Sequence, residues 1–307
     1  QAKVTMLLGL IPTMYGCITG IEYLLSFDLN HLKIAVNSAP LASVFQFFLY
    51  LGMMCAFASR QKSTIMFCVM TLVFSMILNF SKTTVVMMCI TLLVYFYDAS
   101  KKNKKVKKIF LVSLPLALVL IFASFTIYNN IRFDYDINQY FGDLGYVGNV
   151  SSSMFLPIMY LISPWSNLQY IVDTTFGYSY GLWCLKPFLG YLQLDSLLGE
   201  SVFELIPRYS AFNTYTYISV FYRDFGFIGS GICSFVLGCI IMKIHKMKLK
   251  YPDSPFISTI FALNMYATVM MFFNNHFQQL SYPYTILIIS WIWLKFCAGK
   301  PRDNNTG

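Results

Sequence analysis

Residues 226–242 read GFIGSGICSFVLGCIIM, a run that contains no charged side chain. The chain as a whole is 57% hydrophobic and only 11% charged, whereas roughly a quarter of the residues in a soluble domain are charged. The hydrocarbon core of a bilayer is about 30 Å thick and accepts roughly 20 apolar residues as a helix. The run therefore predicts a helix that crosses a membrane.

Similar runs recur along the chain and predict an all-α, polytopic transmembrane helical bundle with about eight spans. The expected spans are 4–26, 41–59, 64–80, 83–98, 109–127, 226–242, 256–274 and 283–298. Because a helical bundle in lipid grows by adding spans, residues 1–307 are interpreted as a single integral membrane domain. The chain begins with Gln and enters an apolar run almost at once, so we expect further spans before residue 1.

Lysine and arginine residues gather in alternate connections between the predicted spans. The basic connections are 60–63, 99–108, which includes KKNKKVKK, and 243–255. Positively charged loops stay in the cytoplasm, so both ends of the chain are expected there as well. This topology accounts for the net charge of +9, and no nucleic-acid partner is expected.

The cysteines do not predict a metal site or a disulfide framework. Seven of the eight lie in or beside apolar runs, and only Cys184 lies in a polar connection. The sequence contains neither a CxxC pair nor a P-loop. We therefore predict that the protein uses no metal and no cofactor.

Residues 128–225 form one long connection on the predicted outer side. Such a length without regular structure is uncommon. The connection contains the apolar stretch Met154–Ser163, which is followed by Pro164 and is too short to span. Nearby Tyr and Trp residues suit the level of the lipid headgroups. We expect a large external loop that forms a cap partly embedded at the interface.

Positive charge is scarce in this external loop, which makes its arginines candidate ligand-binding residues. Arginine binds phosphate or carboxylate through two parallel hydrogen bonds and keeps its charge. Arg132, Arg208 and Arg223 could therefore bind an anionic lipid-linked group. The alternative is that each arginine pairs with a neighbouring acid, as Arg223 could with Asp224.

Two further candidates lie at the predicted outer mouths of spans. Lys82, in FSKTT, could bind phosphate, or its ammonium group could simply extend to the interface. His276, in NNHFQQ, could accept a proton from a sugar hydroxyl or make an ordinary polar contact.

Residues 212–229, FNTYTYISVFYRDFGFIG, combine amide, hydroxyl and aromatic side chains directly before a span. Aromatic rings stack on sugar faces, and amides and hydroxyls hydrogen-bond to sugar oxygens. Asn213, Tyr217 and Tyr222 are the candidates for such contacts. An aromatic belt at the interface without a ligand is the alternative.

Three motifs together resemble the bacterial O-antigen and exopolysaccharide repeat-unit polymerases of the Wzy type. They are FSKTT at 80–84, YLISPWSNL at 160–168 and FNTYTYISVFYRDFGFIG at 212–229, in the order that the family shows. The resemblance implies a metal-independent glycosyltransferase of the bacterial inner membrane. Such an enzyme joins undecaprenyl-pyrophosphate-linked oligosaccharide repeat units at the outer face. Membrane lipid, a chain-length regulator and a flippase of the same pathway are the implied partners.

The resemblance also implies roles for individual residues. Departure of the pyrophosphate develops negative charge that fixed cations stabilise, which assigns Arg208 and Arg223 to catalysis, assisted by Arg132 and Lys82. The acceptor hydroxyl needs a base or hydrogen-bond acceptor within roughly 3 Å. The candidates for that group are Asp224, Glu204, Asp195 and His276.

Other functions remain open at this stage. An O-antigen ligase would pass a finished chain to a lipid A core instead of to another repeat unit. A flippase for lipid-linked oligosaccharides would need charged or broken segments at mid-membrane, and the predicted spans have few charges. A non-enzymatic membrane scaffold would not require the polar and aromatic residues of the external loop.

Overall fold

The structure is a computed structural model, and every regular element that it describes is an α-helix. The described residues contain no β-strand, which confirms the predicted all-α class. They are 2–26, 28–37, 42–59, 61–79, 82–100, 107–108, 110–112, 115–116, 119, 123, 152–175, 177–191, 214–272, 277 and 290–293.

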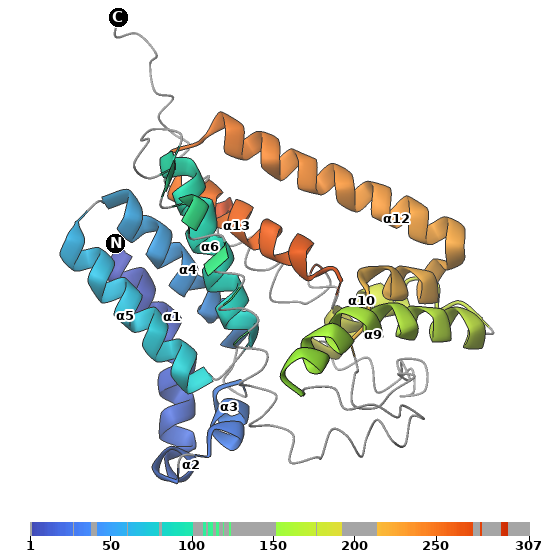
Figure 1. Ribbon diagram of the computed structural model, residues 1–307, viewed down its shortest axis with the longest axis horizontal. Coiled ribbons are helices and arrows are strands. Elements are labelled where there is room, and N and C mark those ends of the chain that lie inside the picture. The colour runs from blue at the N-terminus through green and yellow to red at the C-terminus, as the bar shows by residue number, and fades with distance from the viewer. Residues whose placement is uncertain are drawn as a thin grey trace, which may run out of the picture. The chain divides into compact units, whose positions relative to one another are not determined.

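The helices are labelled in Figure 1. In the N-terminal part they are α1 (Ala2–Thr19), α2 (Ile21–Leu25), α3 (Leu29–Asn37), α4 (Ala42–Ser59), α5 (Lys62–Asn79) and α6 (Lys82–Ser100). Later in the chain they are α9 (Ser152–Thr174), α10 (Leu182–Tyr191), α12 (Tyr217–Lys250) and α13 (Pro255–Met270). Helices therefore occupy most of the predicted spans 41–59, 64–80, 83–98 and 256–274, whereas 109–127 and 283–298 lie mostly outside the described residues.

The chain divides into two compact units. The first comprises residues 1–108, 242–265 and 280–307, and the second comprises residues 109–241 and 266–279. Each unit is described by itself below. The single integral domain expected from the sequence stays a prediction.

Small residues bring the helices of the first unit close together. Figure 1 shows α1, α4 and α5 side by side. A Cβ atom at Gly9 would lie 2.7 Å from the backbone nitrogen of Leu49, and one at Gly52 would lie 2.7 Å from the sulfur of Met6. These pairs make α1 and α4 antiparallel. Close backbone approach through small residues is the usual packing of helices in lipid, where lipid tails are as apolar as leucine.

Large apolar side chains point outward from several helices, opposite to the arrangement in a soluble protein. Ile18 on α1 is 72% exposed, Met66 on α5 is 70% exposed and Phe235 on α12 is 74% exposed, whereas Thr13 and Ser75 are fully buried. The Thr13 and Ser75 hydroxyls lie 3.3 Å apart between α1 and α5. Extended apolar surface of this kind marks contact with lipid or another protein.

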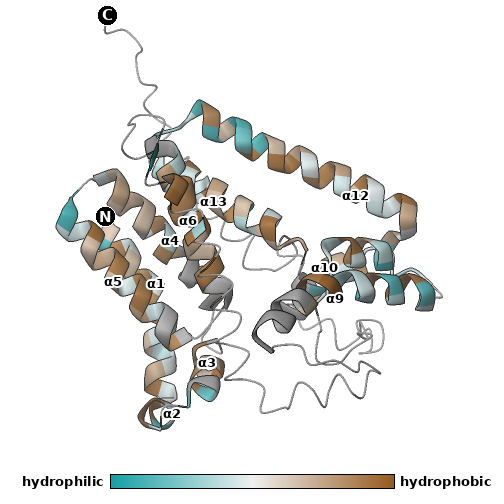
Figure 2. Ribbon diagram, viewed as in Figure 1, coloured by the Kyte–Doolittle hydropathy of each residue, from teal (hydrophilic) through white to brown (hydrophobic). Residues whose placement is uncertain are grey.

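Two of the described helices, Ala2–Thr19 and Tyr217–Lys250, are long and apolar enough to cross a membrane. Figure 2 shows the apolar colouring along much of α12 and hydrophilic residues near its C-terminal end. These two helices are weak support for a membrane protein, because a buried core helix or a signal sequence would also have that length and composition. The number of eight spans stays a prediction.

Two helices differ in extent from the spans predicted for them. The span 4–26 is broken at Gly20, whose φ of −113° and ψ of 34° are not helical, so a separate short helix follows. The connection 243–255 is mostly helical, because α12 continues to Lys250. Lysine is a good helix former and its charge is favourable near a helix C-terminus.

The helix that contains the apolar stretch Met154–Ser163 continues beyond Pro164. Helix α9 runs through Pro164 to Thr174. Proline removes one backbone donor and strains a helix interior, yet Ser163 and Asn167 on either side of it bind the segment before α12. These contacts hold the helix in place beyond the proline. The expected loop 128–225 thus contains α9, α10 and the first nine residues of α12.

Candidate functional site

The start of α12 is held by a capped N-terminus. Thr216 precedes the helix, and its hydroxyl lies 3.1 Å from the hydroxyl of Ser219. The backbone nitrogen of Tyr217 donates to the carbonyl oxygen of Met271 at 3.0 Å. The first amides of a helix have no partner within the helix, so these contacts fix where α12 begins. The residues from Tyr217 to Asp224 form the first turns of this helix.

Helix α9 brings the motif YLISPWSNL to the motif FNTYTYISVFYRDFGFIG. The Ser163 hydroxyl lies 3.0 Å from the Thr214 hydroxyl, and the Asn167 side-chain nitrogen donates to the Thr214 carbonyl at 2.8 Å. Ser163 and Asn167 are both fully buried. Two motifs that are almost fifty residues apart in the sequence thus form one polar contact within the second unit.

Helix α12 is interrupted at Gly226. Its φ of 66° and ψ of −163° are not helical, and essentially only glycine adopts them. A Cβ atom there would lie 2.7 Å from the Tyr178 hydroxyl oxygen. The kink disturbs the helical hydrogen bonds of the preceding turn. The carbonyls of Arg223 and Asp224 instead accept hydrogen bonds from the backbone nitrogens of Ser179 and Tyr180, at 3.1 and 3.0 Å.

The carboxylate of Asp224 is fully buried and caps the N-terminus of α10. Its Oδ1 accepts from the Ser179 hydroxyl at 2.7 Å and from the Trp183 amide at 2.9 Å. Its Oδ2 accepts from the Cys184 amide at 2.7 Å. A negative charge is favourable at a helix N-terminus, where unpaired amides and the helix dipole meet. Asp224 therefore ties the turn before α10 to α12.

The negative charge of Asp224 also affects the thiol of Cys184. Burial raises the pKa of Cys184 well above its ordinary value, and the hydrogen bond and charge of Asp224 raise it further. Both effects disfavour the thiolate. Cys184 is therefore a neutral thiol at physiological pH and a poor nucleophile.

Arg223 is the described residue with the clearest capacity for an anionic ligand. Its Nη1 donates to the Gly177 carbonyl at 3.3 Å, which orients the guanidinium group. Its Nε is buried and has no hydrogen-bond acceptor in the part of the chain that the structure describes. The suggested pairing with Asp224 is wrong, because neighbouring residues of a helix do not face each other.

Aromatic side chains surround this part of α12. Tyr222 packs edge-on against Tyr178, with ring centroids 6.4 Å apart, and Tyr217 packs edge-on against Phe221 at 5.9 Å. Burial raises the pKa of Tyr215 to about 12, so its hydroxyl stays protonated at neutral pH. The start of α12 therefore carries both aromatic rings and hydroxyl groups.

The predicted site residues fall into three groups. Tyr217, Tyr222, Arg223 and Asp224 lie together on α12. Lys82 begins α6 in the first unit. The remaining candidates lie outside the described residues, and they are Arg132, Asp195, Glu204, Arg208, Asn213 and His276.

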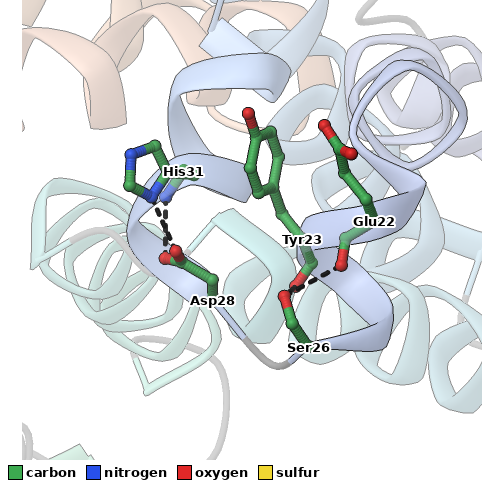
Figure 3. Close-up of polar contacts among 5 residues, drawn as sticks. All are labelled: Glu22, Tyr23, Ser26, Asp28 and His31. Atoms are coloured by element: carbon green, nitrogen blue, oxygen red, sulfur yellow. Dashed lines mark hydrogen bonds and ion pairs between the residues drawn. The ribbon is translucent and has the colours of Figure 1, made fainter.

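The first unit contains an Asp–His pair that was not predicted from the sequence (Figure 3). Asp28 Oδ1 accepts from the His31 amide at 3.2 Å, and Oδ2 lies 2.6 Å from His31 Nδ1. The imidazole stacks on Tyr23 with ring centroids 5.1 Å apart, and it is exposed. A proton on Nδ1 would leave Nε2 as an acceptor. The spacing of three residues at the start of a helix was a readable signal for this pair.

The described part of the chain holds no group of three or more His, Cys, Asp or Glu side chains placed to bind a metal ion. The absence of metal and cofactor stays a prediction.

No protein-family model, no curated protein and no solved structure matches this chain. The assignment of a function therefore rests on the residues and their geometry.

Proposed function

We propose that the protein is a glycosyltransferase of the bacterial inner membrane that polymerises undecaprenyl-pyrophosphate-linked oligosaccharide repeat units into O-antigen or exopolysaccharide. The chain crosses the membrane about eight times with both ends in the cytoplasm. Residues 128–225, which include the start of α12, face the outside. The protein works with a chain-length regulator and a flippase of the same pathway.

The observation that carries the proposal is the state of the Arg223 guanidinium. One nitrogen is held by the Gly177 carbonyl, and the buried Nε is left without an acceptor among the described residues. An unpaired buried donor of a charged group is unfavourable. A pyrophosphate oxygen is an acceptor of the right charge and geometry for it.

The reaction needs no group beyond those of the chain and its substrates. The bond between the anomeric carbon of the growing chain and the pyrophosphate oxygen breaks, and its electron pair leaves with the pyrophosphate. The acceptor hydroxyl oxygen of a new repeat unit forms the new bond to that carbon and gives up its proton. The energy is supplied by the pyrophosphate leaving group.

The cations stabilise the leaving group, and a separate group orients the acceptor. Arg223 and Arg208 bind the pyrophosphate as its charge develops, with Arg132 and Lys82 assisting. His276 or one of the loop carboxylates, Asp195 or Glu204, orients the acceptor hydroxyl and accepts its proton. Tyr217, Tyr222 and Asn213 contact the sugar rings.

Asp224 has a positioning role in this proposal. Both of its oxygens already accept hydrogen bonds, and it is fully buried. A base must come within hydrogen-bond distance of the hydroxyl that it deprotonates, and burial opposes this. Asp224 instead holds Ser179 and the start of α10, and the carbonyl of nearby Gly177 orients Arg223.

A complementation experiment tests the proposal. A strain deleted for the gene is complemented with wild type, Arg223→Ala, Arg223→Lys or Lys186→Ala, and its surface polysaccharide is separated on a gel. Lys186 is the matched control, because its ammonium lies over the Trp183 ring, 4.8 Å from the centroid, in the same unit.

Single repeat units are expected in the deletion strain. Wild type and Lys186→Ala should restore a ladder, and both Arg223 variants should not, since lysine lacks the Nε donor and the planar fork. Immunoblots and apparent Tm values establish that each variant is folded and present. A full ladder from folded Arg223→Ala would remove the proposed role, and an unchanged ladder in the deletion strain would exclude polymerisation.

A further inference from the structure

Three lysines follow one another along one face of α12 at its C-terminal end. Lys243, Lys246 and Lys250 are spaced by three and four residues, which places them on the same side of a helix. All three are exposed. Asp253 is the only acidic residue between positions 243 and 255. This lysine stripe is thus a region of concentrated positive charge.

The fourth lysine of this segment points the other way and has a structural role. Lys248 is 5% exposed, and its ammonium donates to the Pro252 carbonyl at 2.8 Å and to the Ser258 hydroxyl at 2.6 Å. These bonds fix the turn between α12 and α13. The stripe is therefore presented on an anchored helix end, so binding there does not require the helix to become ordered first.

Exposed apolar side chains lie immediately before the lysine stripe on α12. Exposed apolar residues precede it on α12, with Val236 51%, Ile240 49% and Met242 53% exposed. Directly after it, the Lys250 ammonium lies 5.4 Å from the centroid of the Tyr251 ring, and this ring contacts Trp293 at 5.1 Å. Tyr and Trp rings favour the headgroup level, where one end of the ring is apolar and the other is wet.

We propose that the lysine stripe binds the phosphate groups of anionic phospholipids in the cytoplasmic leaflet. The order along the helix matches the order across a leaflet, with apolar residues at acyl-chain depth and lysines with aromatic rings at the headgroups. Binding of a free anion or a nucleic acid would not require exposed apolar residues beside the lysines. The inference rests on the membrane setting of the proposed function.

The test uses the full-length protein, purified in a neutral detergent. Native mass spectrometry measures its apparent Kd for phosphatidylglycerol and phosphatidylcholine. The variants are Lys243→Gln/Lys246→Gln/Lys250→Gln, the same triple change to Arg, and Lys186→Gln as a control in the other unit. Inorganic phosphate is the soluble competitor, and apparent Tm values check the fold. Lys250→Gln alone serves as a milder second variant.

Wild type should bind phosphatidylglycerol more tightly than phosphatidylcholine. The triple Gln variant should weaken phosphatidylglycerol binding roughly tenfold or more, since each lysine near an anionic surface contributes separately. Lys250→Gln should weaken it by a smaller factor, while the triple Arg and Lys186→Gln variants should bind like wild type.

Equal affinity for the two lipids, or unchanged binding by the triple Gln variant, would overturn the inference. Displacement of the lipid by millimolar phosphate would assign the stripe to a soluble anion and overturn it as well. A carbonate wash of cell membranes separates this failure from that of the proposed function. Protein released by the wash would contradict the membrane enzyme itself, whereas retained protein without lipid selectivity would contradict only the lysine stripe.

Discussion

The helices within each unit are held together by different kinds of contact. In the first, α1 and α4 approach so closely that a Cβ atom at Gly9 or Gly52 would overlap its neighbour. In the second, the turn before α10 is attached to α12 by a buried carboxylate and by carbonyls at a kink. Small residues pack helices without specifying chemistry, whereas a buried polar network fixes particular groups in place. Arg223, which this network orients, has a buried Nε without a hydrogen-bond acceptor among the described residues.

Loss of the Asp224 carboxylate should produce the largest effect. Asp224→Ala leaves the amides of Trp183 and Cys184 without acceptors, and each unpaired buried donor destabilises by about 1–3 kcal/mol. Asp224→Asn keeps one acceptor oxygen and should lose less stability. The apparent Tm of the solubilised protein measures this. Asp173→Ala on the exposed face of α9 is the matched control. Equal Tm values for Asp224→Ala and Asp173→Ala would mean that the cap contributes nothing.

A side chain at the kink should have the next largest effect. Gly226→Ala would force alanine to a positive φ and place its Cβ against Tyr178, and such strained positions cost about 1–3 kcal/mol. Gly231→Ala is the matched control, because a Cβ atom there meets nothing within 4 Å. Thermal unfolding should separate the two variants clearly. A tolerated Gly226→Ala would argue that α12 is continuous.

The close contact of the first unit should respond to overpacking. Gly9→Ala pushes α1 away from Leu49 and should destabilise by about 1 kcal/mol or more, while the folded protein should stay active because Gly9 is not among the residues proposed to bind the substrate. Gly238→Ala, with open space around its Cβ, should be neutral. Polymer length on a gel and apparent Tm together check this. Lost polymerisation at unchanged Tm would contradict a purely structural contact.

The smallest effect expected is on the reactivity of Cys184. The Asp224 charge raises the pKa of this thiol in addition to the effect of burial, so Asp224→Asn should lower the pKa and speed alkylation at pH 8 several-fold. Site-resolved mass spectrometry after iodoacetamide treatment gives the rate for each cysteine. The exposed Cys239 should react at the same rate in both proteins. An unchanged Cys184 rate would indicate that the carboxylate does not act on the thiol.

The sequence predicts the helical class and the positions of several helices because apolar runs of span length have few other solutions. Residues 42–59, 62–79 and 82–100 are helices close to the expected bounds. The kink at Gly226 is different. Gly229 and Gly231 lie in the same apolar run without a positive φ, so composition could not show which glycine bends the chain.

The sequence predicts only part of the candidate site, because some of its contacts join distant segments. Tyr217, Tyr222 and Arg223 are found from residue type and position in one motif. The role of Asp224 depends on Ser179 and on the amides of α10, which are about forty residues away in the sequence. Such contacts follow from tertiary packing and leave no local pattern.

Polymerisation by the purified protein tests the central claim most directly. Wild type or Arg223→Ala in liposomes receives the undecaprenyl-pyrophosphate-linked repeat unit, and glycan length and released undecaprenyl pyrophosphate are measured together. Wild type should form longer chains and release one undecaprenyl pyrophosphate for each linkage, and folded Arg223→Ala should do neither. Translocation of the lipid across the liposome membrane with no new linkage would contradict the account and identify a transporter.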